Sequence, residues 1–117
     1  MDRDLKDRTK KFALEIIKLV SELPKTTVGF ELGKQLLRSG TSIGANYRSS
    51  QRGRSRAEFI SKLSVVQEEA DETIFWLELI SESNLLFEDR IKSALKEANE
   101  LTAIFTTMLI NSKKNSG

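Results

Sequence analysis

Residues 39–59, SGTSIGANYRSSQRGRSRAEF, join two long helical patterns and carry arginines at positions 48, 52, 54 and 56. Near the middle of this stretch, Gly53 can adopt the positive φ of a tight turn. Ser55 and Glu58 have the spacing of a capping box, in which two side chains accept hydrogen bonds from amides at the start of a helix. The stretch therefore predicts a helical hairpin that turns at residues 51–54.

On both sides of this turn, apolar residues recur every three or four positions, which is typical of helices with one buried face. Pro24 is expected to end the first helix, because the residue before a proline is disfavoured in the α region. Asn84 suits the left-handed position that follows a helix. The predicted helices cover residues 4–23, 28–50, 56–83 and 87–111, with a frayed tail at 112–117.

Four helices joined by short connections favour an all-α fold, an antiparallel up-down-up-down four-helix bundle. The length of 117 residues is typical of a single domain, so we expect residues 1–117 to form one bundle. The sequence has no apolar run long enough to span a membrane and no signal-peptide pattern at its start. We therefore expect a cytoplasmic protein without membrane contact.

The composition argues against several kinds of active site. The chain has no His and no Cys, which excludes a His-based catalytic triad, His-containing or thiolate zinc sites, and a disulfide framework. The glycines of residues 32–44 lack the spacing of a phosphate-binding loop. We expect a protein that is not an enzyme, with no catalytic residue, no bound metal and no cofactor.

Six carboxylates and no Lys or Arg lie within residues 68–82. A divalent-metal or acid–base site would need these carboxylates to converge on a pocket. The alternative, which we favour, is an ion-paired face. A hairpin that turns near residue 53 would bring Arg38 toward Glu68 and Lys34 toward Glu72, which would offset the repulsion between the two carboxylates.

Positive charge is concentrated in the first half of the chain. Residues 1–56 hold 13 Lys and Arg against 6 Asp and Glu, whereas residues 57–117 hold 6 against 11. Planar guanidinium groups suit phosphate oxygens, and phosphate contacts bind nucleic acid with little sequence preference. Solubilising surface charge is the alternative. The predicted nucleic-acid-binding residues are Arg48, Arg52, Arg54, Arg56 and Lys62.

The third helical pattern is apolar around most of its circumference at residues 74–80, which is more than one bundle core can bury. Glycines at positions 33, 40 and 44 form a stripe on the second pattern. Each costs about 1 kcal/mol relative to alanine, which indicates close approach of another helix. We predict a homo-oligomer; core packing with a half-exposed tryptophan, and glycines that break the helix, are the alternatives. The predicted interface residues are Gly40, Gly44, Phe75, Trp76 and Leu79.

Three motifs follow one another along the chain: QLLR at residues 35–38, SIGAN at 42–46, and a basic turn followed by Phe59. Their order resembles the 23S ribosomal RNA intervening sequence protein family, small four-helix-bundle proteins. The resemblance implies a ring of subunits, commonly a homopentamer, and no enzymatic activity. It extends to the accessory proteins of diversity-generating retroelements, which implies RNA or DNA and a reverse transcriptase as partners.

Two functions remain as hypotheses. In the first, the basic turn contacts RNA or DNA phosphates. In the second, the apolar and acidic surface of the third helix docks a partner protein without nucleic acid. Asn46, in the SIGAN motif, is expected to cap a helix or bridge two helices.

Overall fold

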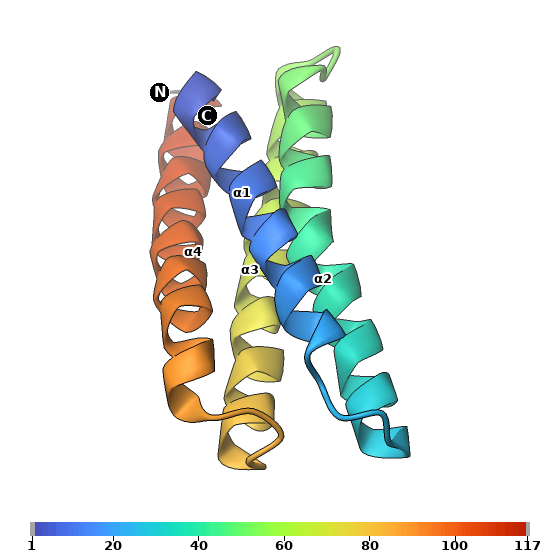
Figure 1. Cartoon of the computed structure of the whole chain (residues 1–117). Coiled ribbons are helices and arrows are strands. Elements are labelled where there is room, and N and C mark those ends of the chain that lie inside the picture. Colours follow the sequence, from blue (N-terminus) through green and yellow to red (C-terminus); the bar gives the residue numbers. More distant parts are fainter. Residues whose placement is uncertain (1, 117) are drawn as a thin grey trace.

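The structure, a computed structural model, describes residues 2–116, which fold into four helices (Figure 1). They are α1 (Asp2–Ser21), α2 (Thr27–Gln51), α3 (Arg56–Glu82) and α4 (Glu88–Ser116). Consecutive helices run antiparallel and pack on one another, and α4 returns beside α1. The predicted all-α, up-down-up-down four-helix bundle is confirmed.

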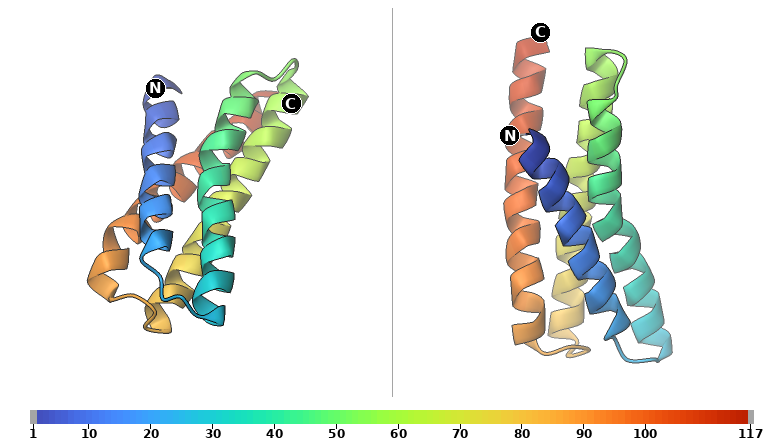
Figure 2. Two further views of the ribbon diagram at one scale, coloured as in Figure 1. Left: turned by 45° about the vertical axis from the view of Figure 1, so that its right-hand side comes forward. Right: turned by 45° about the horizontal axis from the view of Figure 1, so that its top comes forward.

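The bundle is elongated, with extents of 47 × 21 × 20 Å. The start of α1, the end of α4 and the α2–α3 turn lie at the same end, and the other two connections lie at the opposite end (Figures 1 and 2). Within residues 2–116, no helix has both the length and the apolar character needed to cross a membrane.

Local capping signals set several helix boundaries where the sequence predicts them. The Ser55 hydroxyl accepts a hydrogen bond from the Glu58 amide at 3.1 Å, which confirms the predicted cap of α3. Asn84 has φ 61°, which confirms its left-handed conformation after α3. At α2 the cap is Thr26, whose hydroxyl accepts from the Gly29 amide at 3.1 Å. These bonds satisfy amides that have no partner inside the helix.

The predicted frayed tail is wrong for residues 112–116, because α4 continues to Ser116. Lys113 and Lys114 lie in its last turn, where positive charge interacts favourably with the helix dipole. Arg56 Nη2 also donates a hydrogen bond to the Ser112 carbonyl at 3.2 Å. Residue 117 of that prediction lies outside the described residues.

The prediction of positive φ at Gly53 is also wrong, because none of the described glycines has a positive φ. Glycine at position 53 is instead favoured by close approach of the backbone. A Cβ at this position would lie 3.2 Å from the Phe59 amide nitrogen and 3.3 Å from the Ser50 carbonyl oxygen. The turn therefore presses the end of α2 against the start of α3.

The glycine stripe of α2 faces α1 of the same chain. A Cβ at Gly40 would lie 2.9 Å from Ile16, and a Cβ at Gly44 would lie 3.3 Å from Thr9 Oγ1. The predicted close helix approach therefore exists, but within one chain. Both glycines are buried against α1, so their predicted position at a subunit interface is corrected: α1, not a second copy, covers them.

Buried side chains from all four helices form the core. Near the α2–α3 turn, the fully buried rings of Tyr47 and Phe105 have centroids 5.5 Å apart. This contact joins α2 to α4 and supports the helix segment that carries Arg48. Asn46 Nδ2 donates to the Ser42 carbonyl at 2.8 Å, so this group bonds within its own helix.

Candidate nucleic-acid interface

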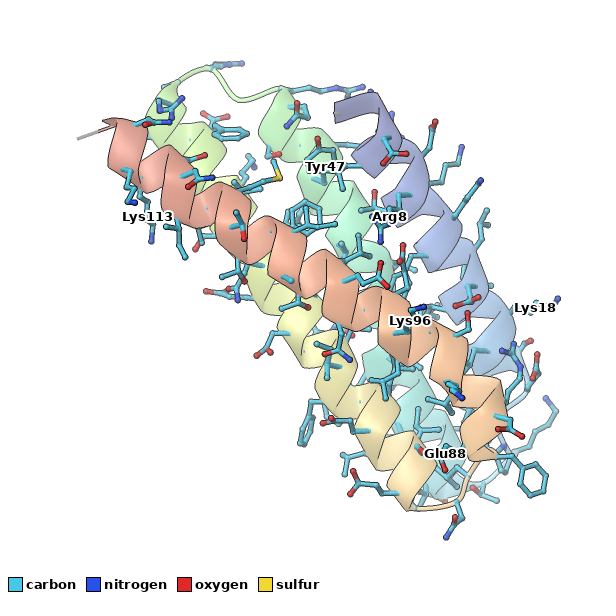
Figure 3. All side chains as sticks on the ribbon, turned by 90° about the vertical axis from the view of Figure 1, so that its left-hand side faces the viewer. Arg8, Lys18, Tyr47, Glu88, Lys96 and Lys113 are labelled. Atoms are coloured by element: carbon cyan, nitrogen blue, oxygen red, sulfur yellow. The ribbon has the colours of Figure 1, made fainter. Side chains whose placement is uncertain are left out.

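The antiparallel packing brings four chain segments together around the α2–α3 turn. We call residues 4–10, 41–66 and 103–115 the turn end, and residues 11–40 and 67–102 the opposite end. The turn end holds 10 Lys and Arg but 3 Asp and Glu, whereas the opposite end holds 8 and 13. In Figure 3, Lys113 lies at the end of the bundle that carries the turn and Glu88 lies at the other end. The fold therefore converts a charge imbalance along the sequence into one along the long axis of the molecule.

The five cations predicted to bind nucleic acid all lie at the turn end, but they point along different helices. The four arginines are exposed, and the lysine is partly buried at the first turns of α3. Arg48 lies on α2 beside α1, where it lines a groove between the two helices. Arg56 lies toward α4, because it donates to the Ser112 carbonyl. Arg52 and Arg54 lie between them around the turn.

None of these five cations forms an ion pair with a carboxylate among the residues that the structure describes. The ion pairs within 4 Å join other residues: Arg8 to Glu97 and Glu100, Arg38 to Glu72, and Arg90 to Glu22. The other arginines whose side chains the structure describes, Arg8, Arg38 and Arg90, thus have internal counterions. Those around the turn are exposed to solvent and available to an anion from outside.

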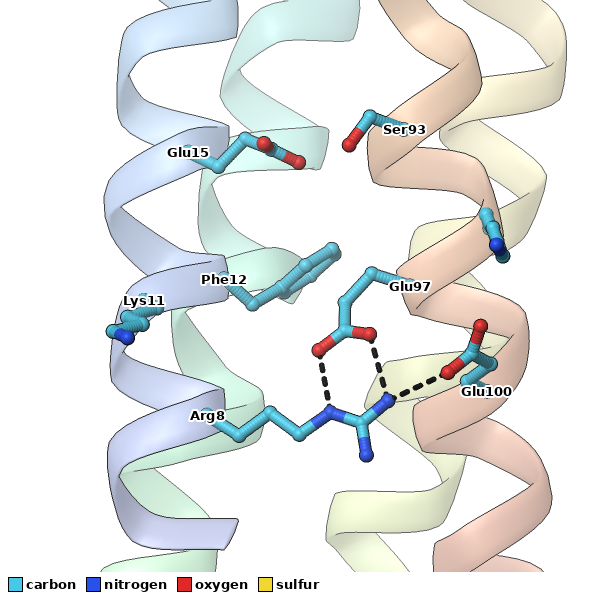
Figure 4. A pocket seen from close by; sticks show the side chains of 8 residues that line it. Arg8, Lys11, Phe12, Glu15, Ser93, Glu97 and Glu100 are labelled. Carbon is cyan, nitrogen blue, oxygen red and sulfur yellow. Dashed lines mark hydrogen bonds and ion pairs between the residues drawn. The ribbon is translucent and has the colours of Figure 1, made fainter. Parts of the chain in front are cut away.

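The ion pairs of Arg8 connect α1 to α4 across a cavity of about 360 Å³ (Figure 4). Arg8 Nε and Nη2 donate to the two Glu97 carboxylate oxygens at 2.7 and 2.8 Å, and Nη2 also donates to Glu100 at 2.8 Å. The hydrogen bonding of the Arg8 guanidinium to the Glu97 carboxylate is the main reason that the pKa of Arg8 is raised. The lining holds three cations, Arg8, Lys11 and Lys96, against three carboxylates, Glu15, Glu97 and Glu100, so this cavity is a polar seam without net charge.

The acidic stretch of α3 is partly paired, but one helical turn away from the predicted register. Arg38 Nη2 lies 3.1 Å from Glu72 Oε1, not beside Glu68. Glu72 therefore pairs with Arg38 and not with Lys34, so the predicted Lys34–Glu72 pair is wrong as well. The register differs because the hairpin is centred at Ser55, midway between residues 38 and 72, rather than at Gly53. Trp76 Nε1 donates to the same Glu72 oxygen at 3.1 Å.

Glu69 is the one carboxylate of this stretch in an unfavourable position. Its Oε1 atom is buried and has no hydrogen-bond partner among the described residues. Burial, and then the neighbouring Glu72, raise the pKa of Glu69. Within residues 2–116, no group of three or more carboxylates is placed to hold a metal ion.

The apolar residues predicted at a subunit interface on α3 differ in exposure. Phe75 is 52% exposed and meets the ring of Trp76 edge-on, with centroids 5.0 Å apart. Trp76 and Leu79 are half-buried, and Trp76 packs against the core. Core packing therefore buries much of the Trp76 side chain, whereas the Phe75 ring points toward solvent.

Sequence reasoning missed five cations of the turn end: Lys6, Arg8 and Lys10 on α1, and Lys113 and Lys114 on α4. The lysines of α1 occur in a segment that alternates with aspartates, so its local charge looks balanced. Those of α4 fall in the tail that was expected to fray. The usable signal was topological, because an up-down-up-down bundle places the start of α1 and the end of α4 beside the α2–α3 turn.

Comparisons with known proteins identify the family of the chain. Residues 1–107 match the family model of the 23S rRNA-intervening sequence protein. A crystal structure of a protein of unknown function, from the S23 ribosomal protein family of Bacteroides thetaiotaomicron, superimposes with a TM-score of 0.83 and 36% sequence identity. The match covers 89% of this chain and 96% of that one. Among curated proteins, none matches the chain. The resemblance seen in the sequence motifs is thus confirmed, and the chain belongs to the 23S rRNA-intervening sequence protein family.

Proposed function

We propose that this protein is a non-enzymatic nucleic-acid-binding protein whose turn end contacts the phosphates of RNA or DNA. The observation that carries the proposal is the contrast in pairing among the arginines whose side chains the structure describes: Arg8, Arg38 and Arg90 have carboxylate partners, while the four exposed arginines around the turn have none among the described residues. A polyanion would supply the missing counterions. The residues that make these contacts are Arg48, Arg52, Arg54, Arg56 and Lys62.

The chemistry of the turn end favours backbone contacts over base recognition. Guanidinium groups match phosphate oxygens, and such contacts position a protein on nucleic acid without reading its sequence. Base stacking needs exposed aromatic rings. The one aromatic ring of residues 41–58 belongs to Tyr47, which is buried against Phe105. The ligand is therefore expected to be bound with strong salt dependence and little sequence preference.

The proposed functional form is a homo-oligomer, a homopentamer by family resemblance. The exposed Phe75, with Trp76 and Leu79 beside it, supports a subunit contact on α3. A ring would present several turn ends to one nucleic-acid molecule, so that weak contacts add through multivalency. The proposed partners are RNA or DNA and, by family resemblance, a reverse transcriptase, and the proposed location is the cytoplasm. Light scattering tests the assembly: a particle of several protomers is expected, and a monomer at micromolar concentration would contradict it.

A second candidate function is a protein-docking scaffold without nucleic acid. It is supported by the surface of α3, where the exposed Phe75 ring is flanked by the exposed carboxylates of Asp71 and Glu78. A partner with a basic, apolar-tipped segment would suit that surface. If the protein binds no nucleic acid at low salt, protein docking becomes the favoured function in place of nucleic-acid binding.

The test is a titration of labelled duplex DNA, single-stranded DNA and structured RNA at about 50 and 150 mM salt. Binding should weaken steeply with salt, by roughly 0.9 in log–log slope for each duplex phosphate contacted. Arg52, Arg54 and Arg56 together changed to Gln should lower the slope by up to about 2.7. The matched control changes Lys18, Lys25 and Lys34 to Gln, which removes the same charge from exposed positions at the opposite end. Equal losses in both variants would refute the assignment of the site.

A further inference from the structure

A groove runs between α1 and α2 at the turn end and is distinct from the turn itself. Its volume is about 430 Å³. It exists because the two helices touch at Gly44, where a Cβ would lie 3.3 Å from Thr9 Oγ1, while the lining residues beside that contact are small. Ala13 and Ala45 leave a trough that longer side chains would fill.

Cations stand on both sides of this groove. Lys6 and Lys10 line it from α1, and Arg48 lines it from α2. The two lysines are four residues apart, and so are Arg48 and Arg52, which places each pair about one helical turn, roughly 5.4 Å, apart along its helix. Arg48 therefore connects the groove to the turn. Two short rows of positive charge face each other across an uncharged floor.

The groove cations have no internal counterion that would occupy them. Lys6, Lys10 and Arg48 are exposed and form no ion pair with any carboxylate among residues 2–116 whose side chains the structure describes. Asp7 is the one acidic residue of the lining, so the groove keeps a net charge of +2. The corresponding seam on the other flank of α1 differs, because there Arg8 is held by Glu97 and Glu100.

These observations point to an anionic ligand in the groove. A floor of small residues lets a narrow chain approach the helix backbones, and cations on each side can each reach a phosphate oxygen. Successive cations along each helix can follow successive charges of a polyanion, which a single small anion would not require. The open connection to Arg52 gives such a chain a continuous path from the turn.

We propose that the α1–α2 groove binds the phosphodiester backbone of a nucleic-acid strand that continues from the arginine turn, with Lys6, Lys10 and Arg48 as its phosphate contacts. This inference rests on the proposed function and adds a path to it: the strand continues from the turn along the groove between α1 and α2. The contacts are to phosphates, so RNA and DNA strands are both accepted.

The experiment compares two double variants of the full chain in the same salt titration. Lys6 and Lys10 changed to Gln should lower the log–log slope by about 2 for duplex DNA and weaken binding on the order of 10-fold at about 0.15 M salt. The control, Lys18 and Lys25 changed to Gln, removes two charges from exposed positions at the opposite end and should change affinity less than about twofold. Losses on RNA and DNA should be similar.

A second variant tests the groove without changing charge. Ala45→Gln places a longer side chain on the groove floor and should weaken binding several-fold, whereas Ala103→Gln, on exposed α4, should not. Melting temperatures of all variants establish that they fold.

The outcomes separate this inference from the function on which it rests. If the wild-type protein binds no nucleic acid, both fail. If it binds and the turn variant loses affinity, but the groove variants match their controls, the groove assignment alone is overturned. A loss confined to RNA or to DNA would show sugar recognition and would also overturn the backbone assignment.

Discussion

The two ends of this bundle use charged side chains in different ways. At the opposite end, Glu22 accepts hydrogen bonds from Arg90 at 2.6 and 2.8 Å, and near the middle Arg38 pairs with Glu72. At the turn end, the exposed arginines have no carboxylate partner among the described residues. Exposed ion pairs contribute only about 0–1 kcal/mol each, so their absence at one end costs little stability. The difference indicates that the exposed arginines around the turn keep their charge for a ligand, while the paired arginines stabilise the fold.

The largest expected effect comes from reversing the charge of the unpaired end. Arg52, Arg54 and Arg56 changed to Glu should weaken nucleic-acid binding at low salt at least about 100-fold, because attraction to phosphates becomes repulsion. The melting temperature should change by only a few degrees, since these side chains are exposed. Fluorescence anisotropy measures the affinity. The same reversal at Lys18, Lys25 and Lys34 should act weakly, and an equal effect there would remove the distinction between the ends.

A smaller effect, on stability rather than binding, is expected from the paired side chains. Glu97→Gln removes the two-oxygen contact to Arg8 across the α1–α4 seam, where both side chains are about three-quarters buried. We expect a loss of about 1 kcal/mol in the free energy of unfolding, measured by urea denaturation. Nucleic-acid affinity should stay within about twofold.

Glu78→Gln is the control for that variant, because Glu78 is exposed and forms no ion pair among the described residues. It should leave the free energy of unfolding unchanged within error. If Glu97→Gln were equally harmless, the Arg8 contacts would not stabilise the seam. If it instead weakened binding strongly, the division of roles between paired and unpaired charge would be wrong.

The smallest effect concerns the direction of pH dependence of stability. The pKa of Glu69 is raised by burial, so the folded state takes up this proton more readily than the unfolded state. Its ionised form therefore destabilises the fold at neutral pH, and stability is regained as pH falls through the folded pKa. Glu69→Gln should be slightly stabilising at pH 7, and this advantage should fade in acid. Denaturation curves at pH 7 and 4 measure it.

Glu22 provides the opposite case, because the hydrogen bond from Arg90 lowers its pKa. Its contribution is present above the unfolded pKa, about 4.3, and is lost as pH falls through the folded pKa. Glu22→Gln should therefore be destabilising at pH 7, with a difference that shrinks in acid. If Glu22→Gln and Glu69→Gln changed the free energy of unfolding at pH 7 in the same direction, these assignments would be contradicted.

The sequence predicted those features that depend on local chemistry. Ser55 caps α3 and Asn84 is left-handed because each conformation is decided within a few residues. The arginines around the turn could be predicted to lie at one end of the bundle because they are close together in the sequence. Family membership followed from short motifs in a fixed order.

Features that depend on how helices pack could not be predicted in the same way. The pairing of Arg38 with Glu72 depends on where the hairpin is centred, and a shift of two residues in that centre moves each partner by one helical turn. The α2 glycines required a neighbouring helix, but the pattern could not tell α1 from a second copy. Lys6 and Lys10 join the turn end only through antiparallel packing, so no local charge count identifies them.

The central claim is that the exposed arginines around the turn, and not the ion-paired arginines, contact phosphates, and the arginine side chains provide an internal comparison for testing it. In ¹⁵N-labelled protein, the Nε–Hε NMR signals of all seven described arginines can be followed while a short duplex is added. The account predicts shifts for Arg48, Arg52, Arg54 and Arg56, and unchanged signals for the paired Arg8, Arg38 and Arg90. Shifts of the paired arginines with no change around the turn would contradict it.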